Sequence, residues 1–103
     1  MADLRGTALV VEDLPDTRKW LVQQLGDAYP DLQITAVGDL SSAQAFLRST
    51  RTLSLALIDL GLPDGSGIDL IRDIALRWPQ AIAVVATIYD GVVRLTDAAK
   101  LNS

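Results

Sequence analysis

The stretch "LALIDLGLPDGSG", residues 55–67, joins an apolar run to a single acid and then to a turn rich in Pro and Gly. The run belongs to a longer segment, residues 53–59, whose mostly apolar side chains are typical of a strand buried on both faces of a parallel sheet. Asp59 is placed at the end of this strand, where burial of an unpartnered carboxylate is costly. The stretch therefore predicts a buried strand that presents one acid at its carboxyl end.

Strands and helices alternate on both sides of this segment. Further apolar or alternating runs predict strands at residues 7–11, 32–37 and 81–87. Helical spacing predicts amphipathic helices within 14–30 and 67–79, and around Ala43, Phe46 and Leu47 with Ser41 or Ser42 as its N-cap. This pattern indicates an α/β fold, a doubly wound parallel sheet with helices on both faces. Any site is then expected at the carboxyl ends of the strands.

The last segment, residues 88–103, is ambiguous in sequence. Val92, Leu95 and Ala99 recur at helical spacing and favour a helix, whereas Gly91 weakens that interpretation. We expect one domain over residues 1–103, because the chain is too short to hold a second core.

Composition excludes several classes of function. The chain has 103 residues, a net charge of −4, no His and no Cys, so it offers no thiol nucleophile, disulfide framework or thiolate metal site. The acidic balance gives no reason to expect direct binding to nucleic acid or to acidic membranes. With no signal segment or long apolar run visible, a cytoplasmic protein is expected.

Four polar residues follow the predicted strands at the same edge of the sheet. Glu12 and Asp13 follow the first strand, Asp59 ends the third, and Thr87 ends the fourth. If the first and third strands are neighbours, three carboxylates converge and repel one another, so a positive partner is required. Mg²⁺ is the expected cation, because it prefers oxygen ligands and is held by one or two carboxylates together with phosphate oxygens.

This arrangement resembles the receiver domain of two-component response regulators. The matching features are Glu12–Asp13 after "ALVV", Asp59 in "LALIDLGLPDGSG", and Thr87 after "AVVA". The match covers residues 7–90 in the expected order, and residues 91–103 form an atypical tail. The resemblance implies a flavodoxin-like fold and a cytoplasmic signalling protein rather than a conventional enzyme, with at most self-catalysed phosphoryl transfer and autodephosphorylation.

The resemblance also implies roles for individual residues. Asp59 would accept a phosphoryl group from the phosphohistidine of a sensor histidine kinase. Mg²⁺ would be held by the Asp13 and Asp59 carboxylates and by the backbone carbonyl of Gly61, with Glu12 acting mainly through water. Thr87 would be the switch hydroxyl that turns toward the phosphoryl oxygens.

The chain departs from the family pattern after its fourth strand. The family's fifth strand, which ends in a phosphate-contacting Lys, has no counterpart, and Lys100 lies in the wrong element for that role. Tyr89 is a candidate for the aromatic switch only by its position. The expected strand order is therefore 2-1-3-4, with the fifth strand missing. The fourth strand would become an open edge, which predicts a homodimer through that edge or aggregation.

Other interpretations of these residues stay open. Glu12 and Asp13 are also suited to capping the following helix, and Asp64, beside Pro63 and Gly65, is interpreted as a turn residue rather than a ligand. A phosphorylation-independent pseudo-receiver would keep the fold and signal by protein contact alone, and the missing Lys favours it. An aspartyl-phosphate hydrolase is disfavoured, because the position two residues after Asp59 is Gly61 rather than a second acid.

Overall fold

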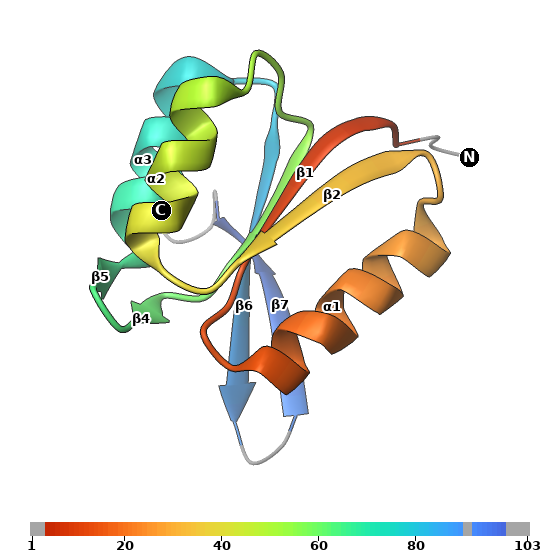
Figure 1. Ribbon diagram of the computed structural model, residues 1–103, viewed down its shortest axis with the longest axis vertical. Coiled ribbons are helices and arrows are strands. Elements are labelled where there is room, and N and C mark those ends of the chain that lie inside the picture. The colour runs from red at the N-terminus through yellow and green to blue at the C-terminus, as the bar shows by residue number, and fades with distance from the viewer. Residues whose placement is uncertain (1–3, 90–91, 99–103) are drawn as a thin grey trace.

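The computed structural model describes residues 4–89 and 92–98, and Figure 1 shows a central sheet with helices on both faces. The elements in chain order are β1 (Gly6–Val11), α1 (Pro15–Ala28), β2 (Leu32–Val37), α2 (Leu40–Ser49), β3 (Leu55–Ile58), β4 (Gly61–Leu62), β5 (Gly65–Ser66), α3 (Gly67–Arg77), β6 (Ile82–Tyr89) and β7 (Val92–Asp97). The predicted strands and the first three helices are present, with boundaries shifted by one or two residues.

The central sheet has the order β2-β1-β3-β6-β7. The first four of these strands are parallel, and β1 lies between β2 and β3. The predicted order 2-1-3-4 is thereby confirmed for the four parallel strands. Since parallel strands end at the same edge, the loops after β1, β3 and β6 leave the sheet side by side.

Helices cover the two faces of the sheet unequally. Side chains of α1, including Leu21 and Leu25, pack with Ala8 and Val10 of β1 on one face. Side chains of α2 and α3, including Leu47 and Leu70, pack on the other face. In Figure 1 α1 lies on one side of the sheet, and α2 and α3 lie together on the other. The sheet is therefore doubly wound, as the sequence predicts.

The segment after β6 is a strand, not the helix that the spacing of Val92, Leu95 and Ala99 favours. β7 pairs antiparallel with β6 along its whole length, from Val84 opposite Asp97 to Tyr89 opposite Val92. The sheet therefore has a fifth strand, but one that runs opposite to the other four. The prediction that the fourth strand forms an open edge is wrong, because β7 occupies that edge. A homodimer through the edge of β6 loses its structural basis for the same reason.

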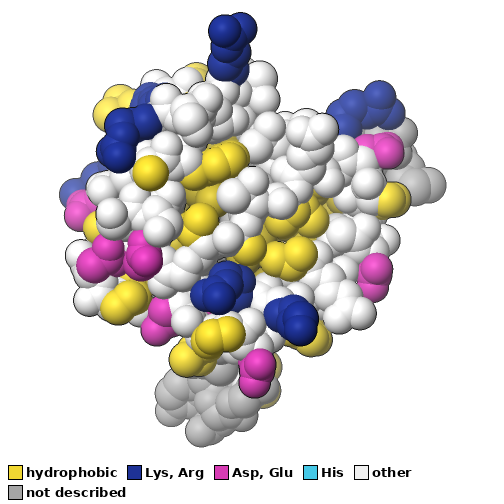
Figure 2. All heavy atoms as spheres, viewed as in Figure 1, with side chains coloured by type: hydrophobic (Ala, Val, Ile, Leu, Met, Phe, Trp, Pro, Cys, Tyr) yellow, Lys and Arg dark blue, Asp and Glu magenta, His cyan; other side chains and the backbone are white. Residues whose placement is uncertain are grey.

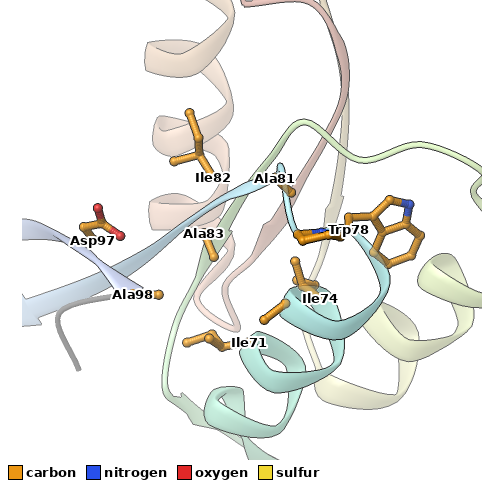
Figure 3. Close-up of a pocket in the computed structure, with 10 residues that line it drawn as sticks. Ile71, Ile74, Trp78, Ala81, Ile82, Ala83, Asp97 and Ala98 are labelled. Atoms are coloured by element: carbon orange, nitrogen blue, oxygen red, sulfur yellow. The ribbon is translucent and has the colours of Figure 1, made fainter. Parts of the chain in front are cut away.

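Grooves flank the part of the sheet formed by β6 and β7. One groove of about 450 Å³ lies beside α3, and Figure 3 shows Ile71 and Ile74 on one wall and Ala83 and Ala98 on the other. A second groove of about 510 Å³ lies beside α1 on the opposite face, where Trp20 and Leu95 contribute to its lining. Residues of β6 and β7 thus line a groove on each face of the sheet.

The opposite edge of the sheet is formed by β2, which is only partly buried. Figure 2 shows the side of the molecule on which β2 lies. Hydrophobic side chains reach the surface near its middle, between α2 and α1, with Lys and Arg side chains around them. This agrees with the alternating pattern of residues 32–37, which predicts a strand near the sheet edge.

The first turn of α2 is capped by an acid that precedes it. The Asp39 carboxylate accepts a hydrogen bond of 2.7 Å from the Ser42 N–H, and this hydrogen bonding holds the pKa of Asp39 below its ordinary value. The prediction of Ser41 or Ser42 as N-cap is therefore wrong, because the helix begins at Leu40 and both serines lie in its first turn. At α3, Ser66 is the N-cap and accepts from the Ile68 N–H at 3.2 Å.

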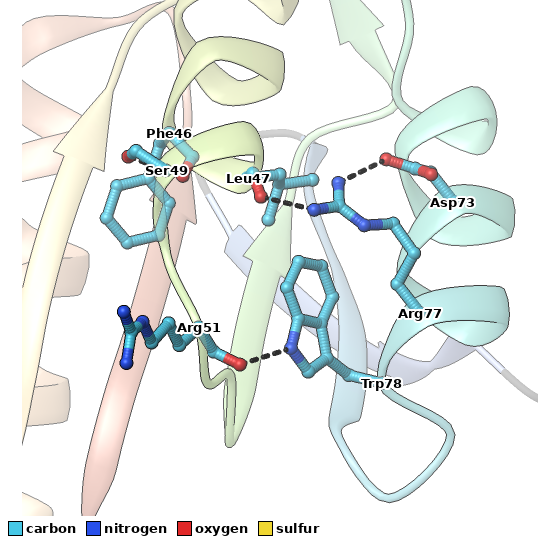
Figure 4. A network of polar contacts seen from close by, with 7 residues as sticks. All are labelled: Phe46, Leu47, Ser49, Arg51, Asp73, Arg77 and Trp78. Carbon is cyan, nitrogen blue, oxygen red and sulfur yellow. Dashed lines mark hydrogen bonds and ion pairs between the residues drawn. The ribbon is translucent and has the colours of Figure 1, made fainter.

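The carboxyl ends of α2 and α3 are joined by a polar network, shown in Figure 4. Arg77 donates to the Leu47 carbonyl at 2.7 Å and to the Asp73 carboxylate at 3.4 Å. Its guanidinium lies 4.4 Å from the centroid of the Trp78 ring, whose Nε1–H donates to the Arg51 carbonyl at 3.2 Å. These contacts fix the carboxyl end of α3 against the carboxyl end of α2.

Candidate functional site

The structure brings three of the predicted site residues together. Val11 and Ile58 are paired across β1 and β3, so the residues that follow them, Glu12 and Asp59, leave the sheet next to each other. Carboxylate oxygens of Glu12, Asp13 and Asp59 all lie within 4.8 Å of one another. We call these three residues the acidic cluster. Its position at the carboxyl edge of the sheet agrees with the prediction from sequence.

Glu12 is the buried member of the acidic cluster, with only 2 % of its surface exposed. Burial raises its pKa to about 7, and hydrogen bonds with Asp59 and Asp13 and the charge of Asp59 act in the same direction. A weaker hydrogen bond from the Leu14 N–H, at 3.4 Å, opposes them. Near neutral pH, Glu12 is thus partly protonated, which reduces the repulsion among the three acids.

We expect the free energy of unfolding of the metal-free protein to depend on pH through the titration of Glu12. Because its pKa is raised in the folded state, the folded protein binds more protons than the unfolded chain between pH 4.5 and about 7. The contribution of Glu12 to the free energy of unfolding is thus complete below pH 4.5 and is lost as pH rises through 7. Relative to Glu12→Gln, the free energy of unfolding of the wild type should fall by about 1 to 3 kcal/mol as the pH rises from 4.5 to about 7.

Chemical denaturation of both proteins at a series of pH values, in chelated buffer, measures this difference. Glu12→Gln serves as the reference because it keeps the side-chain volume and removes the titration. Free energies of unfolding that run parallel for the two proteins from pH 4.5 to pH 8 would contradict the assignment.

Asp59 is held by the loop that follows it. Its Oδ1 accepts a hydrogen bond of 3.0 Å from the Gly61 N–H. Gly67, the first residue of α3, closes the loop by donating its N–H to the Leu60 carbonyl at 3.1 Å. A Cβ on Gly67 would lie 2.7 Å from Ile58 Cγ2 and closer still to the Asp59 carbonyl oxygen. The backbone around Asp59 is therefore packed directly against the start of α3.

Arg18 supports the other side of the site, and the sequence analysis did not identify it. Its Nη1 donates to the Glu12 carbonyl oxygen at 2.9 Å. A Cβ on Gly38 would lie 2.8 Å from the same nitrogen, so this glycine leaves the space that the guanidinium occupies. Arg18 thus connects the loop after β1 with the loop after β2. In sequence its only signal is a basic residue in the first turn of a helix, where an acid is favoured.

Asp64 has a larger role than that of a turn residue. It lies between β4 and β5, yet its carboxylate accepts hydrogen bonds from the Leu40 N–H at 2.7 Å and from the Ser41 N–H at 2.9 Å. Sequence alone gives no signal for this contact, because Asp64 and Leu40 are 24 positions apart. The loop that follows Asp59 is therefore attached to the first turn of α2.

Thr87 lies on β6, and its side chain contacts β7. Its hydroxyl donates to the Arg94 carbonyl over a long 3.5 Å, and the two residues are paired across the strands. Within the described part of the chain, the structure does not bring Thr87 into hydrogen-bonding contact with the acidic cluster. Tyr89 is the last residue of β6, and its side chain lies outside the described residues, as does Lys100. Their roles stay predictions.

An acidic cluster at the carboxyl ends of β1 and β3, in a doubly wound and mostly parallel sheet, is the arrangement that the resemblance to receiver domains implies. Comparison with known proteins agrees: the family model of the response regulator receiver domain matches residues 8–102. The chain belongs to this family.

The particular relatives are bacterial regulators. The chain is 34 % identical over 99 residues to the response regulator protein PilR of Pseudomonas aeruginosa, covering 96 % of this chain and 22 % of that protein. It is 42 % identical over 97 residues to the transcriptional regulatory protein CitB of Klebsiella pneumoniae, covering 93 % of this chain and 41 % of that protein. The chain thus spans less than half the length of these relatives.

Solved structures support the fold. The BeF3-activated receiver domain of DrrB matches with a TM-score of 0.66 at 19 % identity, covering 84 % of this chain and 71 % of that one. A mutant of the response regulator MaeR bound to sulfate matches with a TM-score of 0.67 at 23 % identity, covering 84 % and 70 %. The flavodoxin-like fold expected from sequence is thereby confirmed. Among the described residues, none of the helices has the length and apolar character needed to cross a membrane.

Proposed function

We propose that this chain is a phosphoacceptor domain that receives a phosphoryl group on Asp59 from the phosphohistidine of a sensor histidine kinase. The observation that carries the proposal is the acidic cluster, with its three carboxylates within 4.8 Å at the carboxyl edge of the sheet. Membership of the receiver family supports the proposal. Phosphoryl transfer depends mainly on positioning and charge stabilisation, which a rigid edge of this kind supplies.

The residues present fit a hard divalent cation. All candidate donors are oxygens, as Mg²⁺ prefers, and the raised pKa of Glu12 reflects burial and crowding with the other two acids, which a cation would relieve. The Asp13 and Asp59 carboxylates and the Gly61 carbonyl would hold Mg²⁺, with Glu12 acting through water. Bound there, Mg²⁺ supplies positive charge that offsets the negative charge of the incoming phosphoryl oxygens.

Asp59 is the nucleophile in this proposal. One carboxylate oxygen forms a bond to phosphorus while the bond between phosphorus and the histidine nitrogen breaks, and that nitrogen keeps the electron pair. The hydrogen bond between the Gly61 N–H and Asp59 Oδ1 holds the carboxylate in one orientation. The close contact of Gly67 with the backbone of Asp59 limits movement of the nucleophile.

The product places new charge and acceptor oxygens beside the loops that follow β3 and β6. Thr87 is the proposed switch hydroxyl, which would exchange its long bond to the Arg94 carbonyl for a bond to the phosphoryl oxygens. Thr87 is also paired with Arg94, so its movement would be transmitted to β7. We further propose that the protein acts in the cytoplasm, without direct binding to nucleic acid or membrane by the residues of this chain.

The proposal is tested by labelling the wild type with a small phosphodonor and measuring its intact mass. In Mg²⁺ the mass should increase by one phosphoryl group, and in excess chelator the increase should fall at least tenfold, because the acids then repel the donor. A control incubation with unphosphorylated donor excludes adducts. A wild type that binds Mg²⁺ but takes up no phosphate would favour a receiver that signals by protein contact alone.

A further inference from the structure

We propose that Asp64 is a positioning residue that couples the metal site to α2. It attaches the loop carrying Asp59 and Gly61 to the first turn of that helix, so that cation binding at the acidic cluster and order at the start of α2 strengthen each other. The inference rests on the proposed function, because it takes Mg²⁺ as the ligand of the cluster.

The contact between Asp64 and α2 is made by both carboxylate oxygens. Oδ1 accepts from the Leu40 N–H at 2.7 Å, and Oδ2 accepts from the Ser41 N–H at 2.9 Å. These two N–H groups belong to the first turn of a ten-residue helix, so they have no acceptor within it. A charged acceptor at the positive end of a helix forms a stronger hydrogen bond than a neutral one.

The loop between Asp59 and α3 folds into a short hairpin, formed by β4 and β5, which connects the site to this contact. Its two short strands pair Gly61 with Ser66 and Leu62 with Gly65. Leu62 is buried in the same core cluster as Leu40. Gly65 has φ +156°, and a Cβ there would lie 2.5 Å from Leu40 Cδ2. The hairpin formed by β4 and β5 therefore packs directly against Leu40, the first residue of α2.

The same hairpin begins at the site. Gly61 is its first residue, and its N–H donates to Asp59 Oδ1 at 3.0 Å. Its carbonyl is the proposed third oxygen for the cation. From Asp59 to α2 there is thus a continuous series of contacts through Gly61, the paired strands and Asp64. By reciprocity, a contact that favours cation binding is itself favoured by the bound cation to the same degree.

Asp39 provides a matched control on the same helix. Its carboxylate caps α2 through the Ser42 N–H at 2.7 Å, but it comes from the loop after β2 and not from the hairpin. Asp39→Ala and Asp64→Ala each remove one capping carboxylate from α2. Only Asp64→Ala also releases the hairpin that follows Asp59.

The experiment is a Mg²⁺ titration of the full chain, in which calorimetry measures the Kd and NMR measures amide hydrogen exchange. Asp64→Ala should raise the Kd for Mg²⁺ roughly fivefold or more, whereas Asp39→Ala should change it less than about twofold. Asp64→Asn keeps one oxygen acceptor and should lie between wild type and Asp64→Ala. In the wild type, Mg²⁺ should slow hydrogen exchange of the Leu40 and Ser41 amides, and Asp64→Ala should abolish this protection.

The possible failures are distinguishable. If the wild type binds Mg²⁺ and Asp64→Ala and Asp39→Ala have equal affinities, the coupling is wrong while the proposed function stands. If the wild type binds no Mg²⁺, the proposed function fails and the coupling fails with it. Should Asp64→Ala not fold, Asp64→Asn against Asp39→Asn makes the same comparison.

Discussion

Asp59→Asn is expected to abolish phosphoryl uptake from a small phosphodonor in Mg²⁺. The amide has nearly the shape of the carboxylate, but it lacks an anionic oxygen to attack phosphorus and supplies a weaker oxygen to a cation. Intact-mass measurement should show one added phosphoryl group on the wild type and none on the variant. The loss should be complete rather than graded, because the proposal assigns the attack on phosphorus to Asp59 alone and gives Glu12 and Asp13 roles in holding the cation.

Asp31→Asn is the matched control for this experiment. Asp31 is an exposed acid whose carboxylate is 4.0 Å from the Arg5 guanidinium, and it lies before β2, at the opposite edge of the sheet from the acidic cluster. Its substitution should leave labelling unchanged. Equal labelling of Asp59→Asn and wild type would show that another residue accepts the phosphoryl group and would overturn the assignment of Asp59.

Gly67→Ala is expected to destabilise the protein by about 2 to 4 kcal/mol and to displace Asp59. The added Cβ would lie 2.7 Å from Ile58 Cγ2 and 3.1 Å from Leu60 Cα, and closer than either to the Asp59 carbonyl oxygen. Two of these three atoms belong to the backbone, so the strain is not relieved by turning a side chain. Because Asp59 is in the displaced segment, Mg²⁺ affinity should fall together with the unfolding midpoint.

Gly26→Ala tests whether the effect is specific to the position of Gly67. Gly26 lies within α1, and a Cβ there would meet only Ile34 Cδ1, at an ordinary 3.8 Å. Ala is the better helix former, so Gly26→Ala should stabilise the protein by about 0.5 to 1 kcal/mol. Urea denaturation of both variants measures the two changes. A Gly67→Ala protein as stable as wild type would show that α3 moves away from Asp59 without cost.

The segment from Val92 to Asp97 illustrates where sequence reasoning failed. Val92, Leu95 and Ala99 fit one face of a helix and favour one, although Gly91 weakens that interpretation. The stronger signal was the pair Asp90-Gly91 between two apolar runs, since Asp-Gly in such a place is one of the strongest short-range signs of a hairpin. In the structure β6 ends at Tyr89 and β7 begins at Val92, which agrees with that signal.

Asp64 and Arg18 could not be assigned from sequence, for a different reason. Each acts through backbone groups: Asp64 through the N–H groups of Leu40 and Ser41, far away in the chain, and Arg18 through the Glu12 carbonyl in the loop before α1. Nearly every residue has a backbone donor and acceptor, so the sequence does not indicate which backbone group a side chain will bind. Only the placement of the loops selects which of them a side chain meets.

The sequence by itself determined the alternation of strands and helices, the order of the four parallel strands and the meeting of Glu12, Asp13 and Asp59. The alternation follows from local periodicity, and the strand order is what the resemblance to receiver domains implies. Given that order, the acids meet because parallel strands end at one edge of a sheet. Tertiary structure decided between the helical spacing and the hairpin signal in the sequence around Val92–Asp97, since the backbone of this segment pairs with the edge of β6. It also decided the attachment of Asp64 to α2, because such contacts join segments far apart in the chain and their energies depend on packing that no local pattern encodes.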